Sequence, residues 1–218
     1  MVMEMLIIWW KPPASIPAKV EITGLEHLHD AAKKGHGVLL LSAHMTSLEM
    51  GGGLLQWNTG LTIHGMYRPH ENPVFDAVVL KRRQARFAKM IARDNVKDML
   101  RSLKQGTIVW YAPDQAYRGR NSVLAPFFGQ QVTTNPGTSR IAKLSGAPVV
   151  PYFPLRTAAG LNYELRILPA LEALPSGDLT RDATLINQLI EEQVRQYPEQ
   201  YYWVHRRFKP PHGAAPVG

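Results

Sequence analysis

A histidine and a glutamate, His44 and Glu49, stand five residues apart where an apolar run gives way to a helical pattern. Near neutral pH, a neutral imidazole can take a proton from a hydroxyl group. A carboxylate bound to the other ring nitrogen fixes the tautomer and stabilises the imidazolium that forms. Side chains five apart on a continuous helix point about 140° away from each other, but a strand–turn–helix junction lets His44 fold back toward Glu49. The pair therefore predicts general-base catalysis.

A second interpretation of the same residues is structural. Residues 46–49, TSLE, match the capping box, in which two side chains satisfy backbone N–H groups at a helix start. Glu49 would then be a helix cap, and His44 only the end of a strand. The three glycines at residues 51–53 favour a site, because glycine inside a helix costs about 1 kcal/mol relative to alanine. That cost indicates that something approaches the backbone closely.

The sequence offers no pattern for covalent or metal catalysis. It contains no cysteine, no Gly-x-Ser-x-Gly motif and no histidine spacing typical of a metal site. Direct attack by an acceptor hydroxyl is therefore favoured, and no metal or cofactor is expected.

The elements that must position these residues follow from the hydrophobic pattern. Strands are predicted at residues 37–42, 61–67, 107–112, 147–153 and 162–168. Helices are predicted from the His44 junction to about residue 57, and at residues 73–88, 95–106, 136–145 and 182–196. Strands that alternate with helices indicate an α/β fold with a largely parallel sheet. In such sheets, sites gather at the carboxyl ends of strands, where His44 falls.

The length, composition and charge of the chain limit its fold class and the kinds of partner it can bind. The chain has 218 residues, 45% hydrophobic and 19% charged, which suits a single globular domain. Its net charge of +8 indicates an acidic partner such as nucleic acid, an anionic membrane surface or an acidic carrier protein. No segment approaches the ~18 apolar residues of a spanning helix. Residues 5–10, MLIIWW, could lie at a bilayer interface or pack in the core.

Five segments occur in a characteristic order: VLLLSAH at residues 38–44, YRPHENP at 67–73, VWYAPD at 109–114, SGAPVVP at 145–151 and PEQYYWVHRRFK at 198–209. Together with His44-x4-Glu49 they resemble the late acyltransferases of bacterial lipid A biosynthesis, which share the H-x4-D/E motif of glycerolipid acyltransferases. The resemblance covers roughly residues 20–209.

The resemblance implies an acyltransferase α/β fold, a mixed, largely parallel sheet flanked by helices. The expected organisation is an N-terminal segment at residues 1–19, a single acyltransferase domain at residues 20–209 and a flexible tail at residues 210–218. The implied reaction moves an acyl chain from acyl carrier protein or acyl-CoA to a hydroxyl of a lipid A precursor. Family members usually begin with a membrane-anchoring helix, and this chain starts after it. A peripheral location at the cytoplasmic face of the bacterial inner membrane is therefore expected, on an anionic surface.

The resemblance also implies roles for particular residues. His44 matches the family's base and Glu49 its partner, while Arg83 and Asp114 fall at further functionally important positions. Asp114 could hold Arg83 or another site arginine by a charge-assisted bond, or it could simply form an Asx turn. Arg68 is a further candidate for substrate binding.

Two alternatives remain open at the level of sequence. One is a lysophospholipid or glycerol-phosphate acyltransferase. The other is a non-catalytic lipid- or nucleic-acid-binding protein that uses the basic charge of the chain. A basic run at residues 81–93 has six basic and no acidic residues. No helix-turn-helix, zinc-finger or aromatic RNA-binding signature is present, so no nucleic acid partner is expected. The basic run could bind lipid phosphates or carrier protein, or it could be an ordinary solvated helix face.

Overall fold

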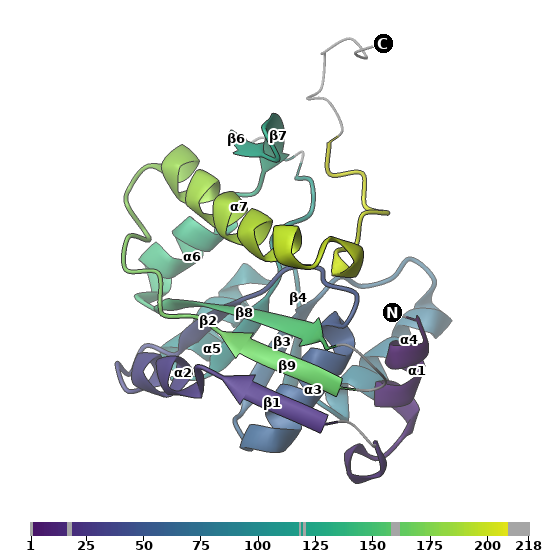
Figure 1. Ribbon diagram of the computed structural model, residues 1–218. Coiled ribbons are helices and arrows are strands. Elements are labelled where there is room, and N and C mark those ends of the chain that lie inside the picture. Colours follow the sequence, from purple (N-terminus) through teal and green to yellow (C-terminus); the bar gives the residue numbers. More distant parts are fainter. Residues whose placement is uncertain (1, 17–18, 118, 120, 158–161, 209–218) are drawn as a thin grey trace.

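The computed structural model describes residues 2–16, 19–117, 119, 121–157 and 162–208 (Figure 1). Its strands are β1 (Lys19–Thr23), β2 (Val38–Leu41), β3 (Ile63–Tyr67), β4 (Lys89–Ala92), β5 (Ile108–Tyr111), β6 (Val123–Phe127), β7 (Gln130–Thr134), β8 (Val149–Arg156) and β9 (Asn162–Ile167). Its helices are α1 (Val2–Trp10), α2 (Leu25–Ala32), α3 (Leu48–Thr59), α4 (Pro73–Gln84), α5 (Val96–Lys104), α6 (Gly137–Ser145) and α7 (Leu179–Gln196), with 3₁₀ turns at Pro13–Ser15 and Pro198–Gln200.

Seven of the strands form one sheet, in the order β1-β9-β8-β2-β5-β3-β4. Strands β8, β2, β5, β3 and β4 are mutually parallel. Strand β9 is antiparallel to β8 and parallel to β1, while β6 and β7 form a separate antiparallel hairpin. The predicted mixed, largely parallel α/β sheet flanked by helices is confirmed.

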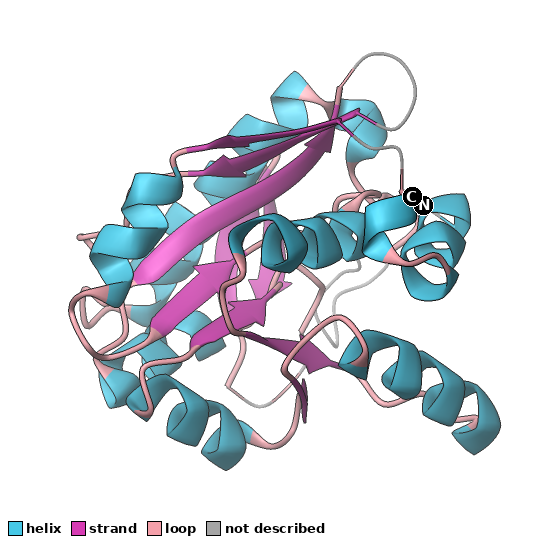
Figure 2. Ribbon diagram, turned by 90° about the horizontal axis from the view of Figure 1, so that it is seen from below, coloured by secondary structure: helices cyan, strands magenta, loops and turns pink. Residues whose placement is uncertain are grey.

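The central strand β2 is apolar at four consecutive positions because helices cover both faces of the sheet. Leu39 and Leu41 pack in a core with residues of α5, α6 and α7. Val38 and Leu40 pack in a second core with residues of α1, α2 and α3. Figure 1 shows α6 and α7 on one side of the sheet and α2 and α3 on the other. Figure 2 shows the same arrangement of helices around the sheet from below.

The basic run at residues 81–93 is not a single helix face. The helix predicted at residues 73–88 ends at Gln84, and the chain turns to form β4, which pairs with β3. Within the turn, Phe87 is buried and stacks on Trp110 of β5. Strands β1 and β4 escaped prediction because both lie at sheet edges, where partial exposure leaves no long apolar run.

The predicted N-terminal segment contributes to the core, since Ile8 and Trp9 of α1 are buried against the rest of the protein. The predicted tail at residues 210–218 lies outside the described residues. Within the described residues, no helix combines the length and apolar character needed to cross a membrane.

Candidate active site

The register of two central strands brings His44 and Asp114 together. Strands β2 and β5 pair with Leu41 opposite Tyr111, and both polar residues lie three positions beyond that pair. Nδ1 of His44 lies 2.5 Å from Oδ1 of Asp114, and the backbone N–H of His44 donates to Oδ2 at 2.9 Å. The pair sits at the carboxyl ends of parallel strands, where α/β proteins place their sites.

The electrostatics of the pair favour an ionised acid beside a basic imidazole. Burial alone would lower the pKa of His44, but the charge and hydrogen bond of Asp114 outweigh it, so this pKa lies above its ordinary value. Burial alone would raise the pKa of Asp114, yet His44 and a hydrogen bond from Tyr201 hold that pKa below its usual range. The side chain of Asp114 is only 2% exposed, whereas that of His44 is 28% exposed. Asp114 therefore supports the ring from behind while the histidine remains accessible.

Contrary to the prediction, Glu49 bonds to residues other than His44. Its carboxylate accepts hydrogen bonds from Nη2 and Nε of Arg83, the latter at 3.3 Å, and from the indole N–H of Trp9 at 3.1 Å. The predicted hydrogen bond between the ring of His44 and the carboxylate of Glu49 is therefore wrong, because Nδ1 of His44 bonds to Asp114 instead. The Asp114–Arg83 bond, which the sequence left open as one alternative, is not formed either, since Glu49 is the acid that holds Arg83. Asp114 is therefore the partner of His44, and Glu49 is the partner of Arg83.

The capping-box interpretation is also wrong. Helix α3 begins at Leu48 with Ser47 at the N-cap, and no side chain caps it. The hydroxyl of Ser47 instead donates to the carbonyl of Pro154 at 2.7 Å. Glu49 lies in the first turn of α3, where the positive end of the helix dipole favours its charge.

The three glycines of α3 permit close packing inside the protein. A Cβ atom at Gly51 would overlap Pro154 of β8, while one at Gly52 would lie 2.8 Å from the ring of Phe87. A Cβ atom at Gly53 would lie 2.8 Å from Ile8 of α1. The close approach predicted from the glycines is confirmed, and its partners are the protein's own side chains.

A cavity of about 410 Å³ opens beside His44. Glu49, Arg83 and Arg68 also line it, so four of the five predicted site residues share one cavity, with Asp114 behind His44. Its apolar wall includes Met5, Leu48, Met66, Met90 and Trp110. Nε2 of His44 has no hydrogen-bond partner in the part of the chain that the structure describes. That nitrogen is available to accept a proton from a group bound in the cavity.

Arg93 also lines the cavity, although the sequence did not single it out as a candidate site residue. Strands β3 and β4 pair with Tyr67 opposite Ala92, so Arg68 and Arg93 follow side by side, and the backbone N–H of Arg93 donates to the carbonyl of Tyr67 at 2.8 Å. Both arginines line the cavity and are exposed to solvent. Recognising 89–92 as a strand was the step needed to place Arg93 at the site.

The described part of the C-terminal motif, residues 198–208, supports the loop that carries His44. Backbone hydrogen bonds join Thr46 N–H to Gln200 O at 2.6 Å and Tyr202 N–H to His44 O at 2.9 Å. Arg207 is buried and anchors this segment on β7, because its Nη1 donates to the carbonyl of Thr133 at 2.6 Å.

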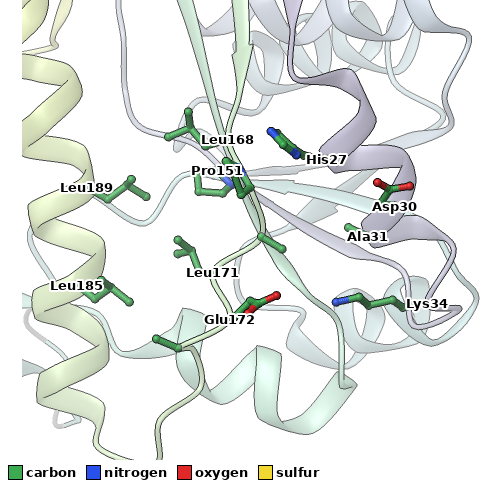
Figure 3. Close-up of a pocket in the computed structure, with 13 residues that line it drawn as sticks. His27, Asp30, Ala31, Lys34, Pro151, Leu168, Leu171, Glu172, Leu185 and Leu189 are labelled. Atoms are coloured by element: carbon green, nitrogen blue, oxygen red, sulfur yellow. The ribbon is translucent and has the colours of Figure 1, made fainter.

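A larger cavity of about 650 Å³ lies between α2 and α7 (Figure 3). Leucine side chains from α7 and from the segment after β9 form one wall, and His27 and Asp30 of α2, with Lys34 in the turn after it, lie on the other side. None of the five predicted site residues lines this cavity, which is therefore not the candidate active site. No three His, Cys, Asp or Glu side chains of the described residues are grouped to hold a metal ion.

Comparison with known proteins matches residues 1–210 to the family of bacterial lipid A biosynthesis acyltransferases. The chain is 37% identical to the lipid A biosynthesis lauroyltransferase of Escherichia coli (strain K12) over 208 residues, which cover 95% of this chain and 67% of that relative. It is 36% identical over 214 residues to the palmitoleoyltransferase of the same organism, covering 96% and 67%. It is 28% identical over 198 residues to the myristoyltransferase, covering 90% and 61%.

Proposed function

The chain belongs to the bacterial lipid A biosynthesis acyltransferase family and is an acyltransferase, and we propose that it transfers a fatty acyl chain from an acyl thioester to a hydroxyl group of a lipid A precursor. The His44–Asp114 pair beside the 410 Å³ cavity is the observation that carries this proposal. The same cavity supplies arginines for anionic substrate groups and an apolar wall for an acyl chain.

In the proposed mechanism, Nε2 of His44 takes the proton of the acceptor hydroxyl. The hydroxyl oxygen then attacks the thioester carbonyl carbon and forms a tetrahedral intermediate with a negatively charged oxygen. When this intermediate collapses, the C–S bond breaks and the leaving sulfur takes the proton from Nε2. The products are an ester and a free thiol. Asp114 acts throughout by fixing the Nδ1–H tautomer and stabilising the imidazolium.

Arg83 is proposed to stabilise negative charge in the cavity. The side chain of Arg83 is only 20% exposed and its guanidinium is held by Glu49, so the cation is already oriented toward the site. A fixed cation is more effective than a mobile one, because no reorganisation is needed as the oxygen anion develops. Glu49 is then a positioning residue for Arg83, and the indole N–H of Trp9 donates to Oε2 of Glu49, which also accepts from Nε of Arg83.

Arg68 and Arg93 are proposed to bind anionic parts of the substrates at the mouth of the cavity. Acyl carrier protein and acyl-CoA both present the thioester on a phosphate-bearing arm, and arginine recognises phosphate through paired N–H groups. Since the acceptor is a lipid, we propose that the reaction takes place peripherally at the cytoplasmic face of the inner membrane, on an anionic surface.

The apolar wall is proposed to receive the acyl chain. Relatives of this chain are named for lauroyl, palmitoleoyl and myristoyl groups, so family membership alone does not fix the chain length. The methionines Met66 and Met90 adapt readily to different apolar shapes and are the first residues to vary when chain length is studied.

Release of free thiol tests the proposal. Acyl carrier protein and CoA thioesters of several chain lengths are supplied with a lipid A precursor, and with a lysophospholipid and glycerol phosphate as competing acceptors. We expect release that depends on the lipid A precursor and disappears in His44→Ala. Preference for the lysophospholipid or glycerol phosphate would assign the protein to another acyltransferase reaction. Unchanged turnover in His44→Ala would remove this histidine as the base.

A further inference from the structure

The C-terminal segment at residues 198–208 places two neighbouring tyrosines on different sides of the active site. Tyr202 lines the cavity beside His44, whereas Tyr201 is not among the described residues that line it and is only 5% exposed. The backbone of Tyr201 is extended, with φ −88° and ψ 144°, and side chains alternate in direction along an extended segment. Tyr201 therefore points behind the cavity wall, toward Asp114 rather than toward a bound substrate.

Backbone and ring contacts fix the position of Tyr201 relative to the loop that carries His44. Met45 and Tyr201 form an isolated antiparallel bridge, and the two backbone hydrogen bonds described above lie on either side of it. The ring of Tyr201 packs edge-on against Trp203, with 5.0 Å between ring centroids, and lies 6.2 Å from the ring of Phe127. Packing therefore holds the ring independently of its hydroxyl, which makes phenylalanine a conservative replacement.

The hydroxyl of Tyr201 donates a hydrogen bond to the carboxylate of Asp114. His44 supplies the two other donors described above, from Nδ1 and from the backbone. An ionised carboxylate has about four lone-pair sites, so a buried one accepts more hydrogen bonds than a single histidine provides. Burial and the charge of Asp114 raise the pKa of Tyr201, so the phenol stays protonated and remains a donor near neutral pH.

We propose that Tyr201 is a positioning residue of the active site, which holds Asp114 and draws part of its negative charge away from the ring of His44. The inference rests on the proposed function, in which the neutral imidazole is the base. Asp114 raises the pKa of His44, and an imidazole that is too basic is already protonated near neutral pH and accepts no proton. By sharing the carboxylate with His44, Tyr201 limits that increase and keeps more of the imidazole neutral.

Other charged and titratable groups face the hydrogen-bonded pair, and removing a tyrosine hydroxyl changes none of their charges. From α4, α3, β5 and the C-terminal segment respectively, these groups are Arg83, Glu49, Tyr111 and Arg207. Arg83 lowers the pKa of His44 and Glu49 raises it, so these two bonded side chains oppose each other. Burial raises the pKa of Tyr111 to about 12, so its phenol is neutral in the same pH range. A difference between the wild type and a hydroxyl-deleted variant therefore reports on the lost hydrogen bond.

The titration of His44 tests the inference without any turnover. The 218-residue chain is isotope-labelled at Cε1 of histidine for NMR, and the His44 signal is assigned by its absence in His44→Ala. In Tyr201→Phe the full charge of Asp114 faces the ring, so His44 should titrate at a higher pH than in the wild type. Asp114→Asn should move the titration to lower pH. Adding Tyr201→Phe to Asp114→Asn should cause no further shift, because the tyrosine acts only through the aspartate.

Two further variants show that the hydroxyl of Tyr201 is responsible. Tyr152→Phe is the matched control, because Tyr152 is also buried and its hydroxyl has no hydrogen-bond partner in the described part of the chain. This control should leave the His44 titration in place. A fluorinated tyrosine at position 201 has a more acidic phenol and is a stronger donor, so it should move the titration to lower pH.

Thiol release should show the same effect on the base. Tyr201→Phe should reduce kcat/KM about three- to tenfold at pH values below the His44 midpoint and approach the wild-type value above it. The reason is that only the neutral fraction of His44 has changed. A side chain that matters for packing alone would reduce the rate equally at every pH.

Two outcomes would overturn the inference. One is a His44 titration that is unchanged or moves to lower pH in Tyr201→Phe, in a protein whose urea midpoint shows that it is folded. The other is a loss of thiol release in Tyr201→Phe that is the same at every pH. An absence of turnover in the wild type would instead contradict the proposed function, and the NMR titration would still decide the role of Tyr201.

Discussion

Asp114 holds His44 by accepting two hydrogen bonds, one at each carboxylate oxygen: Oδ1 accepts from Nδ1 at 2.5 Å and Oδ2 accepts from the backbone N–H at 2.9 Å. One buried side chain thus fixes both the ring and the main chain of the proposed base. The arrangement follows from strand pairing, because β2 and β5 end side by side. Three residues after the end of each strand, the chain reaches His44 and Asp114 respectively. The pairing of the two central strands therefore sets the positions of both residues.

His44 and Asp114 should act as one unit in turnover. We expect His44→Ala to abolish nearly all thiol release and Asp114→Asn to reduce it by about two to four powers of ten. The double variant should be no slower than His44→Ala alone, because the aspartate acts only through the histidine. Steady-state rates of the three variants check this. Losses that multiply in the double variant would show that Asp114 contributes independently.

The Glu49–Arg83 pair should stabilise the fold as well as the site. Both side chains are mostly buried, at 13% and 20% exposed, so removing one leaves an unpaired charge. Glu49→Gln and Arg83→Met should each cost about 1–3 kcal/mol of unfolding free energy. The double variant should cost less than the sum by about 1 kcal/mol or more. Urea unfolding measures all three, and strictly additive losses would mean that the contact contributes nothing.

The glycines of α3 should differ in their tolerance of alanine. Gly51→Ala meets the ring of Pro154, which is fixed in β8, and should destabilise the protein by about 1–3 kcal/mol. Gly53→Ala meets the side chain of Ile8, which can shift, and gains about 1 kcal/mol of helix propensity. It should therefore cost less than Gly51→Ala. Equal urea midpoints for Gly51→Ala and the wild type would refute the packing explanation.

The two arginines at the mouth of the cavity should affect substrate binding rather than the chemical step. Arg68→Gln and Arg93→Gln should each raise KM several-fold for the substrate whose anionic group they bind, with kcat little changed. Titrating donor and acceptor separately identifies that substrate. Arg101→Gln, an exposed arginine on α5 outside the cavity, is the matched control. Equal KM values for all three variants and the wild type would exclude an anion-binding role.

Much of the fold could be predicted from the sequence because its central strands are buried on both faces. Continuous apolar runs such as residues 38–41 and 108–111 are recognisable as buried strands. Each predicted strand is present in the structure. The edge strands β1 and β4 carry charged residues and could not be recognised by the same signal. The missed strand β4 explains why the helix after Pro73 was predicted to continue to residue 88.

Four of the five predicted site residues line one cavity, but the sequence did not predict how the acids and their partners pair. Spacing along the chain favours Glu49 as the partner of His44, whereas the sheet register selects Asp114, seventy residues away. A usable signal was present: LLLSAH at residues 39–44 and VWYAPD at residues 109–114 each combine a strand, two small or turn residues and a polar side chain. Aligning the two motifs as neighbouring parallel strands puts His44 opposite Asp114. Contacts made by Trp9 could not be foreseen, because they depend on how α1 packs.

The dependence of kcat/KM on pH tests most directly whether Asp114, rather than Glu49, is the acid that tunes His44. Only neutral imidazole accepts a proton, so activity should rise with pH through a midpoint above the ordinary histidine pKa of about 6.5. Asp114→Asn removes the charge that raises this pKa, so its midpoint should move to lower pH even as its maximal rate falls. Glu49→Gln should move the midpoint less, because Glu49 raises the pKa of His44 only weakly. A midpoint that stays in place in Asp114→Asn and shifts in Glu49→Gln would contradict the account.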